Sequence, residues 1–65
     1  MVSIEVEDKL GHWQRYTIVS ANAASIVKAL KAAIESELAS ASKKARAVDL
    51  KTGQVIDFLQ AQLNN

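Results

Sequence analysis

The 65-residue sequence contains no cysteine and no proline, and it has only one Trp, one Tyr, one Phe and one His. Without Cys, the chain can form neither disulfides nor a thiolate nucleophile or metal site, and this composition is typical of a reducing compartment. A domain of this length buries only about 60% of its unfolded surface. Its stability must therefore come from close packing or from self-association.

The sequence also lacks a charge excess and a long hydrophobic run. Eight Lys and Arg nearly balance seven Asp and Glu, so the whole chain has no strong field to attract polyanions. No stretch approaches the roughly 20 apolar residues of a membrane span, and residues 1–7 alternate where a signal peptide would be basic and then apolar. We expect a cytoplasmic protein with no membrane partner, folded as a single small domain over residues 1–65.

Residues 1–20 are predicted to form a β-hairpin. Val2, Ile4 and Val6 alternate with polar residues, which is the period-2 pattern of a strand with one buried face. Asp8–Gly11 interrupts this pattern with a Gly that can take a positive φ, and the alternation then resumes from Trp13 to Ser20.

Residues 21–42 are predicted to hold one helix, with helical periodicity from about Ala23 to Ser40. Its apolar residues recur at intervals of three and four, and Ser20 or Asn22 is the expected N-cap. The predicted apolar arc contains Ile26, Val27, Leu30, Ala33, Ile34 and Leu38. Lys43 and Lys44 follow the predicted helix end, where cations favour the helix dipole.

Residues 44–60 are predicted to form a second hairpin around Lys51-Thr52-Gly53. Gly53 stands where a three-residue turn needs a left-handed residue. The expected cross-strand pairs are Val48 with Ile56, Arg46 with Phe58, Ala47 with Asp57, and Asp49 with Val55. Residues 61–65 are expected to form a polar tail.

These elements predict an α+β fold of order ββαββ, in which a four-stranded, mostly antiparallel sheet carries one helix on one face. The core is expected to form between the helix and one side of the sheet. Its strand residues are predicted to be Val2, Ile4, Val6, Tyr16, Ile18, Val48, Leu50, Ile56 and Phe58.

One helix covers only one side of such a sheet, so the other side is the expected binding surface. If Tyr16 faces the helix, alternation places Trp13 and Arg15 on the open side. The open side would also carry Ser3, Glu5, Glu7, Thr17, Val19, Ala45, Ala47, Asp49, Val55, Asp57 and Leu59. An apolar patch centred on Trp, with Arg beside it, is typical of protein interfaces. The alternative is that Trp13 only covers its cross-strand partner or Leu10.

Two features of the helix each allow a functional and a structural interpretation. Its outer side carries the small residues Ser25, Ala29, Ala32, Ser36 and Ala39. They would allow another backbone to approach, but Ala also simply favours helix formation, and we prefer that interpretation. Glu37 falls within the apolar arc; we expect it to reach water or Arg46 and not to act as a catalytic carboxylate.

Catalysis and metal binding are disfavoured by the residues available. The single His has no spacing that indicates a nucleophilic Ser, and it lies near only two acidic residues. The two glycines stand in separate turns, so no phosphate-binding loop is indicated. We expect no enzyme activity, no metal and no cofactor.

The sequence therefore favours a small non-enzymatic protein-interaction module that self-associates, for example as a homodimer, or acts as an adaptor. Its predicted contact residues are Trp13, Arg15, Val19, Val55 and Leu59. The alternative is a nucleic-acid-binding module that uses Trp13 and Arg15 with a basic cluster. That cluster contains Lys43, Lys44, Arg46 and Lys51. Four acidic residues expected on the open side argue against the alternative, because they would repel a phosphate backbone.

Overall fold

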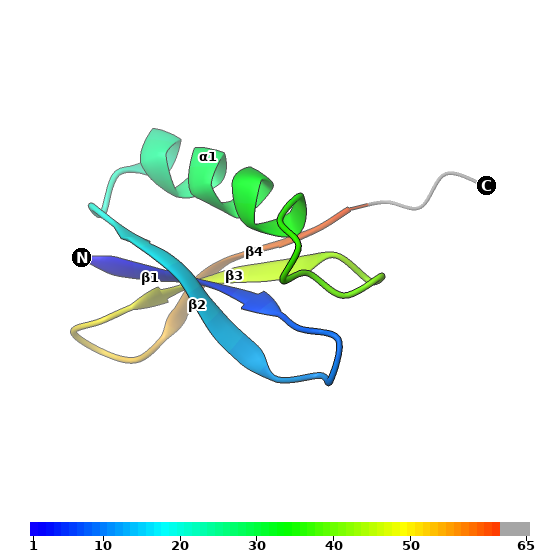
Figure 1. Ribbon diagram of the computed structural model, residues 1–65. Helices are drawn as coiled ribbons and strands as arrows, with labels where there is room; N and C mark the ends of the chain where they lie inside the picture. Colours follow the sequence, from blue (N-terminus) through cyan, green and yellow to red (C-terminus); the bar gives the residue numbers. More distant parts are fainter. Residues whose placement is uncertain (62–65) are drawn as a thin grey trace.

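The computed structural model describes residues 1–61 and confirms the ββαββ order (Figure 1). The elements are β1 (Val2–Glu7), β2 (Trp13–Val19), α1 (Ala23–Ile34), β3 (Lys44–Asp49) and β4 (Val55–Gln60). The strands form one antiparallel sheet, and α1 lies across one side of it. Of the predicted tail, Ala61 packs against the core, and residues 62–65 lie outside the described part.

The strand order is β2-β1-β3-β4, so β1 and β3 form the centre of the sheet. Each hairpin contributes one central strand and one edge strand. The hairpins are joined by antiparallel pairing of β1 with β3, which places Glu5 opposite Arg46. This order brings residues about 40 positions apart in the sequence into contact.

Side-chain hydrogen bonds fix the β1–β2 turn. Oδ1 of Asp8 accepts bonds from the backbone N–H groups of Leu10 and His12, at 2.9 and 2.8 Å, and Oδ2 accepts one from Nε2 of Gln14 at 3.0 Å. The bond from Gln14 and the backbone bond from His12 lower the pKa of the Asp8 carboxyl, because they stabilise its charged form. The Asx-type turn, with Gly11 at φ 83°, thus starts β2 at Trp13.

The second turn closes as the sequence predicts around Gly53. The backbone N–H of Gly53 donates to the Asp49 carbonyl at 2.7 Å, and Gly53 has a φ of 75°. A side chain at this position would be strained because left-handed backbone disfavours a Cβ atom.

Helix α1 begins after Asn22, one of the two predicted caps, but ends earlier than predicted. Oδ1 of Asn22 accepts bonds from the N–H groups of Ala24 and Ser25. The helix stops at Ile34 because the N–H groups of Glu35 and Ser36 donate to carbonyls only three residues back. The hydroxyl of Ser36 also donates to the Ala33 carbonyl, at 2.6 Å. The prediction that the helix extends to Ser40 was therefore wrong, and Leu38 is exposed outside it.

The Asn22 cap gives a first testable prediction. Replacing Asn22 with Ala leaves two N–H groups of the first turn without their acceptor, so we expect the free energy of unfolding to fall by about 0.5–2 kcal/mol. Urea denaturation followed by circular dichroism measures this change. Asn22→Ser, which keeps an acceptor, is the control and should lose much less. Equal losses in both variants would contradict the capping role.

The core lies between α1 and the two central strands. Val2, Ile4 and Val6 of β1 are buried as predicted. The buried residues of α1 are Ile26, Ala29, Leu30, Ala33 and Ile34. Ala45 and Ala47 of β3 are fully buried in the same cluster, although they were predicted on the open side. Small side chains on both β3 and α1 let the helix approach the sheet closely, so the core is aliphatic and contains no aromatic residue.

Half of the large residues predicted for the core are instead exposed. These are Tyr16, Ile18, Val27, Leu38, Leu50, Ile56 and Phe58, and Val48 is only half-buried. On β3 the alternation is regular, so burying Ala45 and Ala47 turns Val48 to the opposite side. The prediction of which β3 side chains point toward the helix was therefore wrong.

Two β-bulges interrupt the alternation of the edge strands. Ile4 pairs with Thr17 but Glu5 pairs with Arg15, which makes Tyr16 an extra residue in β2. Ala47 pairs with Asp57, as predicted, but Val48 pairs with Val55 instead of Ile56. An extra residue reverses the side-chain alternation beyond it. Each edge strand therefore presents different faces before and after its bulge.

Candidate functional site

The candidate site is the side of the sheet that α1 does not cover, which we call the open face. Cross-strand pairing arranges its residues in rows. One row contains Ile18, Ser3, Val48 and Val55, the next contains Arg15, Glu5, Arg46 and Phe58, and the ends carry the pairs Trp13 with Glu7 and Gln60 with Lys44. The open face is thus built from all four strands.

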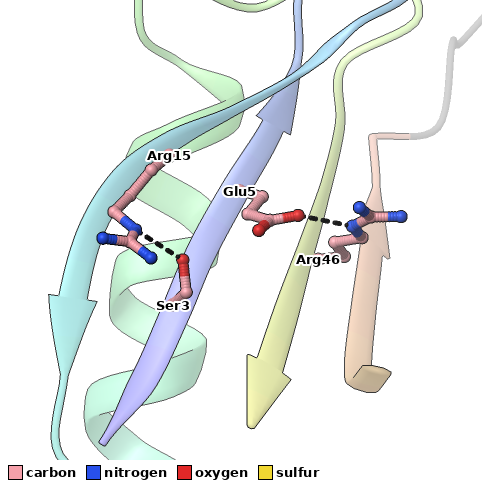
Figure 2. A network of polar contacts seen from close by, with 4 residues as sticks. All are labelled: Ser3, Glu5, Arg15 and Arg46. Atoms are coloured by element: carbon pink, nitrogen blue, oxygen red, sulfur yellow. Dashed lines mark hydrogen bonds and ion pairs between the residues drawn. The ribbon is translucent and has the colours of Figure 1, made fainter. Parts of the chain in front are cut away.

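The polar residues at the centre of the open face are paired within the chain. Nε of Arg46 donates to Oε1 of Glu5 at 2.8 Å, and Nε of Arg15 donates to Oγ of Ser3 at 3.0 Å. Figure 2 shows both contacts on the side of the sheet away from the helix. Ser3 is fully buried among its neighbours, so its hydroxyl needs this partner. These pairings lower the free-energy cost of covering the face.

Arg46 also holds the indole of Trp13. Its Cζ lies 4.2 Å from the centroid of the Trp13 ring, which is a cation–π contact. Trp13 is half-buried, whereas Leu10 is almost fully exposed, so the indole does not cover the turn. Trp13, Arg46 and Glu5 therefore form one connected cluster across three strands.

Beside this cluster lies an apolar area. Phe58 has 51% of its surface exposed, Val55 and Ile18 are also exposed, and Val48 lies half-buried between their strands. Val48 and Val55 are cross-strand partners, and Phe58 is the next open-face residue along β4 after the bulge, so these three form a patch. Ile18 lies in the same row as Val48 and Val55, beyond the small and buried Ser3. Sequence reasoning missed Phe58, Ile18 and Val48 because it placed them in the core.

The predicted contact residues are only partly brought together. Trp13, Arg15 and Val55 lie on the open face, but Val19 and Leu59 pack against the core on the helix side. The bulge at Tyr16 turns Val19 toward α1. Leu59 faces α1 because its cross-strand partner is the buried Ala45, and the bulge at Ile56 places Val55 on the open face. Thr17, Asp57 and Asp49 likewise do not belong to the open face, since their Cα partners are Ile4, Ala47 and Val2.

The basic cluster is dispersed. Nζ of Lys43 donates to the Ile34 carbonyl at the end of α1, at 3.3 Å, and Lys51 is exposed in the β3–β4 turn. Only Lys44 and Arg46 lie on the open face. Arg46 has two aromatic neighbours: Phe58 is its cross-strand partner, as predicted, and Trp13 contacts its guanidinium group.

The charge of the open face also differs from the prediction. Arg15, Lys44 and Arg46 carry three positive charges against two negative charges on Glu5 and Glu7, which leaves a net charge of +1. The predicted excess of acidic residues is absent because Asp49 and Asp57 lie elsewhere. The open face is close to neutral, with charges of both signs.

The two predictions for the helix have different outcomes. In the predicted small-residue stripe, Ala29 is buried and Ala39 is partly buried against the core, so the stripe is only partly exposed. Glu37 is exposed beyond the helix end, as expected, and Arg46 pairs with Glu5.

A separate hollow of about 490 Å³ lies between the first turn and the segment that follows the helix, with Glu7, Asp8, Ser40 and Ser42 in its lining. Oγ of Ser42 donates to the Glu7 carboxylate at 3.2 Å. Across residues 1–61, no three His, Asp or Glu side chains are grouped so that they could hold a metal ion. His12 is exposed in the turn.

The Glu5–Arg46 pair gives a second prediction. Both side chains are partly exposed, so a double-mutant cycle with Glu5→Gln and Arg46→Gln should give a coupling free energy of about 0.5–1 kcal/mol that falls as salt rises. The matched control is Arg15→Gln, because Arg15 also lies opposite Glu5 but donates to Ser3. Equal coupling of Glu5 to both arginines would contradict the pairing.

Comparisons of the chain with protein-family models, curated proteins and solved structures found no match. Among the described residues, no helix has the length and apolar character needed to cross a membrane. A proposal for function therefore depends on the geometry of the open face.

Proposed function

We propose that the chain is a small non-enzymatic interaction module whose open face binds a second copy of the same chain. The observation that carries this proposal is the apolar patch of Ile18, Val48, Val55 and Phe58, which lies beside the Trp13–Arg46–Glu5 cluster on the side of the sheet without a helix. Apolar area of this kind favours association, since burying it removes it from water.

The distribution of aromatic residues supports an interface. Trp13 is half-buried, Tyr16 and Phe58 are exposed, and none of the three belongs to the aliphatic core. Aromatic residues with an adjacent Arg are enriched at the centres of protein interfaces. Dimerisation through the open face would give Trp13 and Phe58 the packing that so small a domain cannot supply.

Charge favours a second copy over a strongly charged partner. A two-fold dimer places the same surface on both sides, so a face with an excess of one sign would repel itself. The open face has a net charge of +1, and its central Glu5 and Arg46 already form a pair. Two copies can therefore meet without a large electrostatic penalty.

The available area indicates a weak dimer. Four strands of six or seven residues present a face of roughly 20 by 19 Å, and a stable interface takes roughly 800 Å² of accessible surface from each partner. That is about a fifth of the 4442 Å² surface of the chain. We expect dissociation in the micromolar range or weaker.

Sedimentation equilibrium across protein concentration tests the proposal. The wild type should change from monomer mass to dimer mass as concentration rises, and Trp13→Ala should need a higher concentration because it removes the ring under Arg46. A constant monomer mass for the wild type up to millimolar concentration would contradict self-association.

Nucleic-acid binding is the second candidate, and one observation favours it. The aromatic residues Trp13 and Phe58 and the basic residues Arg15 and Arg46 share the open face, where stacked bases and phosphates could both be met. Against it, Arg46 is paired with Glu5 and occupies one side of the Trp13 ring.

Salt dependence separates the two candidates. If three or four phosphates are contacted, the logarithm of affinity for mixed-sequence single-stranded DNA or RNA should fall with the logarithm of salt concentration with a slope of about −2 to −3. Fluorescence anisotropy measures this slope. An absence of binding at low salt would exclude the nucleic-acid function and leave self-association unaffected.

A further inference from the structure

A groove separate from the open face runs between the edge strand β2 and the helix. It has a volume of about 340 Å³, and its lining comprises Tyr16, Thr17 and Val19 from β2 with Ser25, Lys28, Ala29 and Ala32 from α1. In Figure 1, β2 rises along the border of the sheet toward the start of α1. The groove is therefore bounded by a strand edge on one side and by a helix on the other.

The strand side of the groove offers backbone hydrogen bonds. In the described part of the chain β2 is paired only with β1, so its other edge presents N–H and C=O groups outward. Such an edge can pair with an added strand. The bulge at Tyr16 limits regular pairing to one side of it, next to Thr17 and Val19.

The helix side offers room for side chains and one charge. Ser25, Ala29 and Ala32 recur at intervals of three and four, so one face of α1 presents small residues over about 10 Å. Three residues of an extended chain span the same length. Lys28 is the only charged residue in the lining. The next acidic residue on this helix face is Glu35, two turns away.

We propose that this groove binds an extended peptide segment that adds to the sheet beside β2, directs an apolar side chain toward Ala29 and Ala32, and places a carboxylate near Lys28. The backbone of β2 would provide affinity, and the groove would select alternating apolar and acidic side chains. The volume accommodates one or two side chains and is small for a drug-sized ligand. The peptide site is independent of the open face.

The experiment is an NMR titration with two short acetylated peptides, one with alternating Val and Glu and one with alternating Val and Lys. The Val/Glu peptide should shift the amide signals of Thr17, Val19, Lys28 and Ala32 and slow hydrogen exchange along β2. Lys28→Glu should weaken its binding at least tenfold and strengthen binding of the Val/Lys peptide. Ala32→Phe, which fills the groove from an exposed position, should abolish binding of both peptides.

Lys31→Glu is the matched control, because it makes the same change of charge one turn away and outside the lining. If it weakens binding as much as Lys28→Glu, or if the peptide shifts the open face or nothing at all, the proposal is wrong. The titration is repeated on Phe58→Asp, which disrupts the open face. Retained peptide binding there shows that the groove acts independently of self-association, whereas loss of binding in a folded Phe58→Asp variant contradicts a separate site.

Discussion

Ile4→Ala is expected to lower the free energy of unfolding by about 2–5 kcal/mol. Ile4 lies on the central strand β1, is fully buried and belongs to the core under α1. At roughly 0.05–0.15 kcal/mol per residue, the total stability of 65 residues is only about 3–10 kcal/mol. The variant should therefore lose a large share of its stability, as measured by urea denaturation and circular dichroism.

Ile18→Ala provides the control with the same chemistry. Ile18 lies on β2 next to β1, but it faces the open side with 39% of its surface exposed. Its replacement should cost much less than Ile4→Ala in the monomer, because more than a third of its surface is already exposed to water and no closed cavity forms. A cost equal to that of Ile4→Ala would show that β2 lacks the bulge and turns Ile18 inward.

The second large effect is expected for Phe58→Asp. About half of the Phe58 side chain is exposed, which corresponds to roughly 100 Å² of apolar surface and about 2.5 kcal/mol on burial. In a two-fold dimer the change acts twice and also adds a charge to the interface. The dissociation constant of the dimer should therefore rise by about tenfold to a hundredfold, as measured by sedimentation equilibrium.

Leu10→Asp is the matched control for this prediction. Leu10 is 81% exposed in the β1–β2 turn, away from the open face, and the substitution makes the same change of charge. We expect its dissociation constant to stay within about twofold of the wild type, with unchanged circular dichroism for both variants. An equal loss of dimer in Leu10→Asp would indicate nonspecific association through exposed apolar residues.

The elements and their order could be predicted because each depends on local patterns. Alternation from Val2 to Glu7, the Asn22 cap and the left-handed Gly53 are physical requirements of short segments. The strand order β2-β1-β3-β4 was not predicted, because pairing of β1 with β3 depends on how the two hairpins meet under the helix.

The faces of the strands could not be predicted in the same way. Size suggests that Phe58 and Val48 are buried and that Ala45 and Ala47 are exposed, but the close approach of α1 requires small residues beneath it. The bulges at Tyr16 and Ile56 carry no clear sequence signal, and each reverses the alternation beyond it. The bulge at Tyr16 is why Trp13 and Arg15 were placed correctly while Val19 was not. Leu59 was misplaced together with its cross-strand partner Ala45.

Intermolecular nuclear Overhauser effects in a mixed sample of isotope-labelled and unlabelled chains test the central claim most directly. Self-association through the open face predicts contacts from the Phe58 ring of one copy to the Ile18, Val48 or Val55 methyl groups of the other. Intermolecular contacts confined to α1 or to the β1–β2 turn, or none at millimolar concentration, would contradict it.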